Sequence, residues 1–243
     1  MKSLHIVQHT ASENLGGLEI QLRHRGVGFQ YQKPLTAGKV PTSAVNSDGL
    51  VLLGGGAWGT LGERTTLPSL DQELRFAYDH LKRNRPVLGL ELGAQIVSIA
   101  AGGSSLPSAT RVQTGRVRRV SENGLGRYLP ASFPIVSFMR DRVVLPHDAE
   151  VLAVDDQDEP AVFTVGPDVI CMTFHPGTGP RMLRALAAEV QASGDELADE
   201  FAFADQHQAE MSGVLEEMMI GISEATGWIV DDPVLSFTSP PET

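Results

Sequence analysis

The sequence predicts an α/β fold with a mostly parallel sheet, and three observations support this prediction. Short apolar runs alternate with segments of helical periodicity through the N-terminal half. The run "GLVLLGGG" (49–56) ends in three glycines, as is typical of a central parallel strand that enters a tight loop. The 243 residues, 42% of them hydrophobic, suit one large domain with a C-terminal extension. Strands that alternate with helices form a sheet covered on both faces.

The other elements of the N-terminal half have their own signals. The run "GFQYQKPL" (28–35) alternates in polarity and ends at a proline, which is typical of an edge strand. The segment 69–85 predicts a helix, because its apolar residues fall on one face and basic residues fill its last turn. The remaining predicted strands are 4–10 and 86–91, and the remaining predicted helices are 16–26 and 92–103.

The middle of the chain changes character. Strand-like runs follow one another with little room for helices, and we expect antiparallel hairpins joined to the sheet. These runs are "VQTGRVRRVS" (112–121), "PIVSFMRDRVVLP" (134–146), "EVLAVDD" (150–156), "PAVFTVG" (160–166) and "VICMTF" (169–174). The pattern returns to helix over 179–194 and stays helical and acidic to Trp228. We therefore expect a domain over 1–190, with residues 191–243 as a helical extension packed on it and a disordered tail.

Composition narrows the function classes. The net charge of −11 predicts repulsion from phosphate backbones, so we expect no nucleic-acid partner. No apolar run reaches membrane-spanning length, and the N-terminus lacks the apolar stretch of a signal peptide, so we expect a cytoplasmic protein without a membrane partner. Cys171 is the single cysteine, which excludes internal disulfides and cysteine-based zinc sites.

The stretch "GLELGAQ" (89–95) places Glu91 between a predicted strand and a predicted helix. A side chain at such a corner projects into the crevice at the carboxyl ends of the strands, where open α/β sheets bind ligands. The amide of Leu92 begins the helix and can bind an oxyanion, as can the amides of Gly55 and Gly56 after the neighbouring strand. His175, in "TFHPGTGP" (173–180), is positioned as a base toward the same corner.

These three pieces resemble the class I glutamine amidotransferases, in particular the small GMP-synthase-like ones. The family pattern is a Gly-Gly loop, then G-x-C-x-G-x-Q, then F-H-P-E, and here it reads "LLGGG", "GLELGAQ" and "FHPG". The resemblance implies a flavodoxin-like three-layer sandwich with an antiparallel excursion. It implies catalytic positions at Glu91 and His175, and oxyanion or substrate contacts from Gly55, Gly56, Leu92 and Gln95.

The resemblance also implies impaired chemistry. The nucleophilic cysteine of the family corresponds to Glu91, and the glutamate that orients the histidine corresponds to Gly177. Losing a triad nucleophile costs on the order of a million-fold in turnover, and a carboxylate cannot form the thioester intermediate. Cys171 lies roughly 13 Å from His175 along one strand, so we expect it to pack in the core rather than replace the nucleophile.

Four hypotheses for Glu91 follow. In the first, the site is degenerate: the helix N-terminus and His175 stabilise the Glu91 charge, and the protein is a binding module or partner subunit. In the second, Glu91 and His175 form an acid/base or carboxylate-nucleophile pair that acts on a small amide or acid. In the third, Glu91 and His175 are metal ligands and His9 and Glu13 could reach the mouth of the same crevice, although no pair has metal-motif spacing. Residual amidotransferase function is the fourth.

The expected ligand is a small amide or amino acid, and the expected macromolecular partner is another protein or a second copy of the chain. The sequence predicts no cofactor and no metal.

Overall fold

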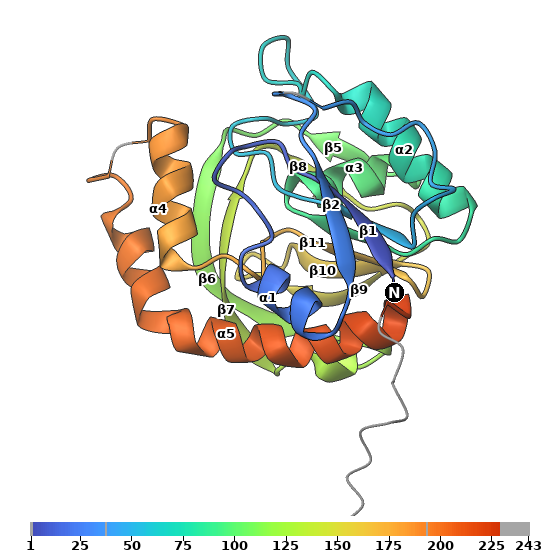
Figure 1. Ribbon diagram of the computed structural model, residues 1–243. Coiled ribbons are helices and arrows are strands. Elements are labelled where there is room, and N and C mark those ends of the chain that lie inside the picture. Colours follow the sequence, from blue (N-terminus) through green and yellow to red (C-terminus); the bar gives the residue numbers. More distant parts are fainter. Residues whose placement is uncertain (1, 37, 193, 229–243) are drawn as a thin grey trace, which may run out of the picture.

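The computed structural model describes residues 2–36, 38–192 and 194–228, and these residues are built around one nine-stranded sheet (Figure 1). Five strands are parallel and come first in the sheet order: β2 (Gly28–Gln32), β1 (Ser3–Val7), β3 (Gly49–Leu52), β4 (Val87–Leu90) and β11 (Val169–Met172). Four antiparallel strands continue the sheet: β10 (Pro160–Val165), β9 (Ala149–Val154), β6 (Arg111–Arg119) and β7 (Ser132–Met139). The predicted α/β class with a mostly parallel core and an antiparallel excursion is confirmed.

The prediction for β11 is partly wrong. We expected "VICMTF" to belong to the antiparallel hairpins, but β11 pairs in parallel with β4 in the middle of the sheet and only its other edge is antiparallel. All four of its residues are buried. A continuous apolar run is the pattern of a strand covered on both faces, whereas position in the chain says little about strand direction.

Helices cover both faces of the sheet. The first face packs against α1 (Gly17–His24) and α5 (Ala198–Thr226), while the second face packs against α2 (Leu70–Lys82) and α3 (Leu92–Ala100). A further helix, α4 (Pro180–Glu189), packs with the first part of α5 against β7. The result is the predicted three-layer sandwich.

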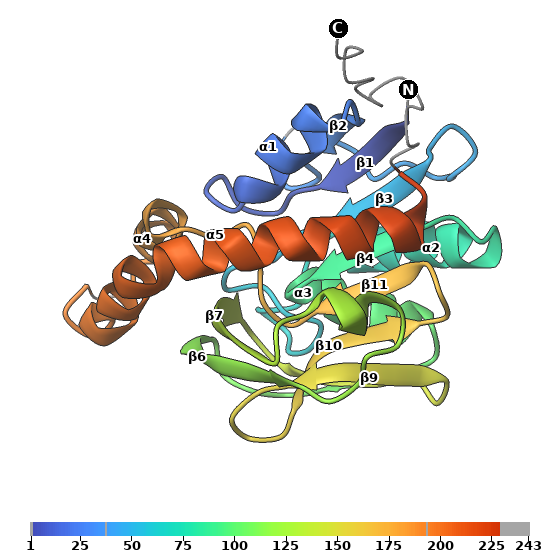
Figure 2. The ribbon, with the colours of Figure 1, turned by 90° about the horizontal axis from the view of Figure 1, so that it is seen from below.

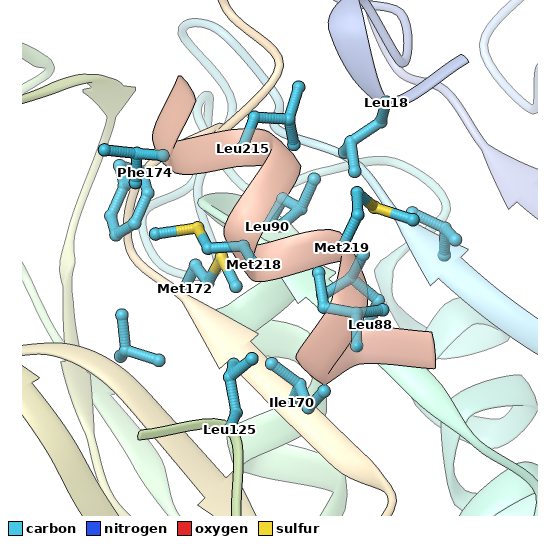
Figure 3. Close-up of a cluster of buried hydrophobic side chains, with 14 of the residues drawn as sticks. Leu18, Leu88, Leu90, Leu125, Ile170, Met172, Phe174, Leu215, Met218 and Met219 are labelled. Carbon is cyan, nitrogen blue, oxygen red and sulfur yellow. The ribbon is translucent and has the colours of Figure 1, made fainter. Parts of the chain in front are cut away.

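The long helix α5 crosses the sheet and contributes to its central core (Figures 2 and 3). Met218 and Met219 are buried in one cluster with Leu88 and Ile170 of the sheet. Trp228, just after α5, is buried against Gly49 and thereby anchors the end of the helix. The division of the chain at residue 190 stays a prediction, and the tail 236–243 lies outside the described residues.

The segment after β7 differs from the prediction of one strand over 134–146. The strand ends at Met139, and β8 (Arg142–Val144) pairs instead with β5 (Ser104–Leu106) in a separate two-stranded sheet. Asp141 interrupts the run with φ of 60°, and its buried carboxylate accepts the N–H of Thr60 at 2.9 Å. No sequence signal indicated β5 or the 3-10 turn η1 (Gly124–Tyr128). Over the described residues, no helix has the length and apolar character needed to cross a membrane.

Candidate functional site at the strand–helix corner

Glu91 occupies a sharp corner between β4 and α3. Its φ of 51° and ψ of −111° are rare for a residue with a side chain, and such strain is retained mainly at functional positions. Gly93 makes the corner possible, because a Cβ there would overlap the carbonyl group of Leu52. The predicted corner is therefore present, with Glu91 at its apex.

The Glu91 side chain is buried and does not face open solvent; the residue is 2% exposed. Its Oε1 accepts the backbone N–H of Phe138 at 2.6 Å. Burial, the charge of Glu13 and a hydrogen bond with Glu13 raise the pKa of Glu91 well above its ordinary value, against the effect of the Phe138 N–H. The Glu91 side chain makes no capping hydrogen bond to the start of α3, so stabilisation of its charge by the helix N-terminus stays a prediction.

Glu13, between β1 and α1, is the partner of Glu91. It is 1% exposed, and its Oε2 accepts the N–H of Gly56 at 3.2 Å. Gly54 makes room for both carboxyl groups, since a Cβ there would overlap Glu13 Oε1 and Glu91 Oε2. Burial raises the pKa of Glu13, although its hydrogen bond with Glu91 works in the opposite direction. Two buried carboxyl groups in contact titrate as a pair that shares one proton.

A buried ion pair lies beside the carboxyl pair. His9 Nε2 is 2.8 Å from Glu73 Oε2, and His9 Nδ1 is 2.8 Å from the Gly54 carbonyl oxygen. Both ring nitrogens face acceptors, which fits a doubly protonated imidazolium. Burial acts to lower the pKa of His9, but Glu73, the Gly54 carbonyl group and Glu13 together outweigh burial, and the pKa is raised. Ser69 donates to Glu73 Oε1 at 2.6 Å.

Sequence reasoning missed Glu73 and the role of Glu13 beside Glu91. A signal for Glu73 was present, because it lies one turn before Ala77 on the apolar face of α2. A carboxylate on a buried helix face needs a charged partner. Nothing in the local sequence around Glu13 marks it as a partner of a residue 78 positions later.

His175 is buried but does not form the expected pair with Glu91. Its Nδ1 accepts the N–H of Gly177 at 3.1 Å, and among the described residues its Nε2 has no hydrogen-bond partner. Burial lowers the pKa of His175 to about 4, so the imidazole is neutral at pH 7. The hydrogen bonds of Glu91 lead to Phe138 and Glu13 instead.

Residue 177 has no space for a side chain. A Cβ on Gly177 would overlap the Leu15 carbonyl oxygen and lie 3.0 Å from the backbone nitrogens of Gly17 and Leu18. The N–H of Gly17 also donates to the Gly177 carbonyl oxygen at 3.0 Å. The start of α1 is therefore packed directly against the segment that follows His175.

The other predicted contact residues serve the scaffold. Gly55 lies under the side chain of Leu92, which a Cβ on Gly55 would overlap. The Gln95 amide donates to the backbone carbonyl groups of Arg140 and Asp141 and thereby fixes the break between β7 and β8. The predicted oxyanion donors are the N–H groups of Gly55, Gly56 and Leu92. Among the described residues, the Gly56 N–H is the one of these three that donates to a carboxyl group, that of Glu13.

Comparison with known proteins decides the family. The model of glutamine amidotransferase class-I matches residues 14–185. The chain belongs to this family. A search of curated proteins finds no match.

Solved amidotransferase structures share the fold. A glutamine amidotransferase from Thermotoga maritima is 22% identical, with a TM-score of 0.76, over 93% of this chain and 98% of that one. One from Methylobacillus flagellatus is 18% identical, with a TM-score of 0.78, over 93% and 96%. A protein from Thermoplasma acidophilum, provisionally named as one of the subunits of a GMP synthase, is 17% identical, with a TM-score of 0.62, over 92% and 95%.

The remaining candidates in this amidotransferase chain lie away from the carboxyl pair. Cys171 is fully buried in β11, and burial raises the pKa of its thiol, so it is no nucleophile. His147 and Asp148 form an exposed pair. No cluster of three or more potential metal ligands occurs in the described part of the chain.

A cleft of about 320 Å³ begins beside Phe138, whose N–H binds Glu91. Arg111 and Glu196 bring opposite charges to its wall, and Ala57 and Leu197 are among its apolar lining. Within the described residues, no carboxylate lies within 4.0 Å of the Arg111 guanidinium. The cleft thus offers a small ligand an acid and a guanidinium that, among the described residues, pairs with Ser108 and with no carboxylate.

Proposed function

We propose that this protein is a catalytically impaired class I glutamine amidotransferase homologue that acts as a binding or partner subunit. One observation carries the proposal: the residue at the corner is a buried carboxyl group, Glu91, which accepts the N–H of Phe138 and lies beside the Glu13 carboxyl group over Gly54. The motif places Glu91 at the position of the family's cysteine. A carboxyl group there cannot form the thioester through which glutamine would be hydrolysed.

The surroundings of His175 support the same proposal. The family's orienting glutamate corresponds to Gly177, where the backbone of Leu15 and Gly17 leaves no space for a side chain. His175 Nδ1 instead accepts a backbone N–H, so no acid stabilises an imidazolium. His175 thus lacks an orienting acid, just as the corner at Glu91 lacks a thiol.

The alternative is an enzyme that uses Glu91 and His175 as an acid/base pair. It is the weaker proposal, because the hydrogen bonds of the two side chains lead to different partners. The buried Glu91 carboxyl group also lacks the open pocket that a substrate would need.

We propose two kinds of binding partner. The cleft with Arg111 and Glu196 has a cation for a carboxylate and an acid for an amino group, as a small amino acid or its amide would require. One structural neighbour is named as part of a GMP synthase, which favours a protein partner, and a homodimer is the other arrangement. A cytoplasmic location is part of the same proposal. Light scattering on the purified protein distinguishes a homodimer from a monomer. A monomer would favour a different protein as the partner.

The first test is ammonia release from glutamine by the purified protein and by Glu91→Cys. We expect neither to exceed the rate of the heat-inactivated sample, because restoring the thiol leaves His175 without an orienting acid and Glu13 in the site. An active class I amidotransferase domain, assayed in parallel, is the positive control. Glutamine hydrolysis by the native chain within a hundred-fold of that control would refute the proposal, since loss of the nucleophile costs on the order of a million-fold.

A further inference from the structure

The segment 10–17 brings Glu13 under the corner and is fixed along its length. The carboxylate of Glu189, at the end of α4, accepts the N–H groups of Ala11 and Ser12, both at 2.9 Å. The N–H of Leu15 is 3.1 Å from the Tyr31 hydroxyl oxygen on β2, and the N–H of Gly17 binds Gly177. The segment therefore joins three elements that are far apart in the sequence: β2, α4 and the loop after β11.

The Glu13 carboxyl group contacts the same residues that would surround the acyl group of a bound ligand. Its Oε2 accepts the N–H of Gly56, which is the oxyanion donor that the glycine loop predicts. Its Oε1 lies with Glu91 Oε2 over the Cα of Gly54. No N–H or O–H of the described residues donates to this buried Oε1, so a shared proton with Glu91 is its remaining interaction.

We propose that Glu13 is an internal plug: its carboxyl group occupies a site for a carboxylic acid or primary amide, and residues 10–17 must move before such a group can reach Glu91. A free carboxylic acid or primary amide offers the same acceptor to Gly56 and the same partner to Glu91. The inference rests on the proposed function only in treating Glu91 as an unreactive residue.

The charged surroundings keep the plug in place. The His9 imidazolium and Glu73 form a neutral pair on one side, and Glu189 lies at the other end of the segment. The shared proton allows both Glu13 and Glu91 to remain buried with one negative charge between them.

Chemical rescue tests the plug. Glu13→Ala leaves a cavity with the Gly56 N–H and Glu91 unpaired, and sodium acetate or acetamide should fill it. We expect each compound to raise the Tm of Glu13→Ala by several degrees in a saturable manner, because a ligand that binds only the folded state stabilises it. The native protein should show no such shift. Sodium chloride at equal ionic strength and ethanol at equal concentration control for salt and for solvent.

Two variants make the outcome decisive. Glu189→Ala removes an anchor of the same segment but keeps the Glu13 carboxyl group, so its Tm should not respond to acetate. Glu13→Gln puts a primary amide in the site, and it should fold with nearly native Tm and ignore acetate. It also covers the case in which Glu13→Ala fails to fold.

The plug is refuted if folded Glu13→Ala is indifferent to acetate and acetamide, or if Glu13→Gln loses as much stability as Glu13→Ala. Both readouts are Tm values, so they are independent of whether the chain hydrolyses glutamine.

Discussion

Glu91 and Gly177 show how single residues decide the chemistry of this site. Glu91 has the strained backbone of a nucleophile corner, at a cost on the order of 1–3 kcal/mol, yet its side chain is buried in a carboxyl pair. Gly177 lies where the resemblance requires an acid, and the backbone of α1 has taken that space. The corner geometry is thus kept while the space around it is filled.

Gly177→Glu should destabilise the protein by about 1–3 kcal/mol, because the new side chain would force apart the Leu15–Leu18 backbone and the loop after His175. Urea unfolding followed by circular dichroism measures the loss. Gly179→Ala, two residues along, is the matched control, since a Cβ there has no atom within 4 Å and its φ of −115° suits any residue. Equal stability of Gly177→Glu and the native chain would show that α1 moves aside easily.

At the scale of elements, α5 acts as one of the core layers. Its buried face meets β4 and β11 from the side opposite α3, and Met218 lies in that face with no exposed surface (Figure 3). The buried residues of α5 recur every three or four positions, and a helix with such a stripe gains its stability from packing. We therefore expect folding of the sheet and docking of α5 to be one cooperative event.

Met218→Ala should cost about 2–5 kcal/mol, as for other large-to-small changes at fully buried sites. Glu217→Ala, on the exposed face of the same turn, should change stability by less than about 0.5 kcal/mol. A single unfolding transition for both variants is expected by near- and far-ultraviolet circular dichroism. A separate early transition in Met218→Ala would mean that α5 melts independently of the sheet.

At the scale of the whole molecule, buried titratable groups make stability depend on pH in opposing directions. Burial lowers the pKa of His80 and of His175 to about 4, so the unfolded chain binds more protons than the folded chain between about pH 4 and 6.5. Stability from these two groups is present above pH 6.5 and is lost as the pH falls toward 4. The raised pKa values of Glu13, Glu91 and His9 act oppositely, since they favour the folded state at lower pH.

The variant His80→Gln measures the contribution of His80 to this pH dependence of stability. The native histidine accounts for roughly 3 kcal/mol of stability lost between pH 6.5 and pH 4, and the variant should lack that part of the pH dependence. Unfolding free energies measured at several pH values give the slope of stability against pH for each protein. The difference between the slopes of His80→Gln and the native chain removes the contribution of the opposing groups, because both proteins contain them. His24→Gln, at an exposed position, should keep the native slope. If the stability of His80→Gln depended on pH as steeply as that of the native protein, the acid sensitivity would come from other groups.

The sequence by itself determined the architecture and the corner. Apolar runs that end in glycine loops and amphipathic helices between them are local signals, and they led to the parallel strands, the covering helices and the position of Glu91. The motif spacing led in the same way to the amidotransferase family. The strands, the helices and each motif by itself depend on residues within one or two turns of each other, where periodicity and backbone sterics are readable.

Only the tertiary structure decided what surrounds Glu91. The direction of β11, the Glu13 carboxyl group beside Glu91 and the backbone that fills the space at Gly177 all join segments distant in sequence. The protonation of Glu91 is decided at the same level: burial and the helix dipole oppose each other, and their balance depends on how completely water is excluded. Exclusion of water is a property of the packed molecule, and no local pattern records it.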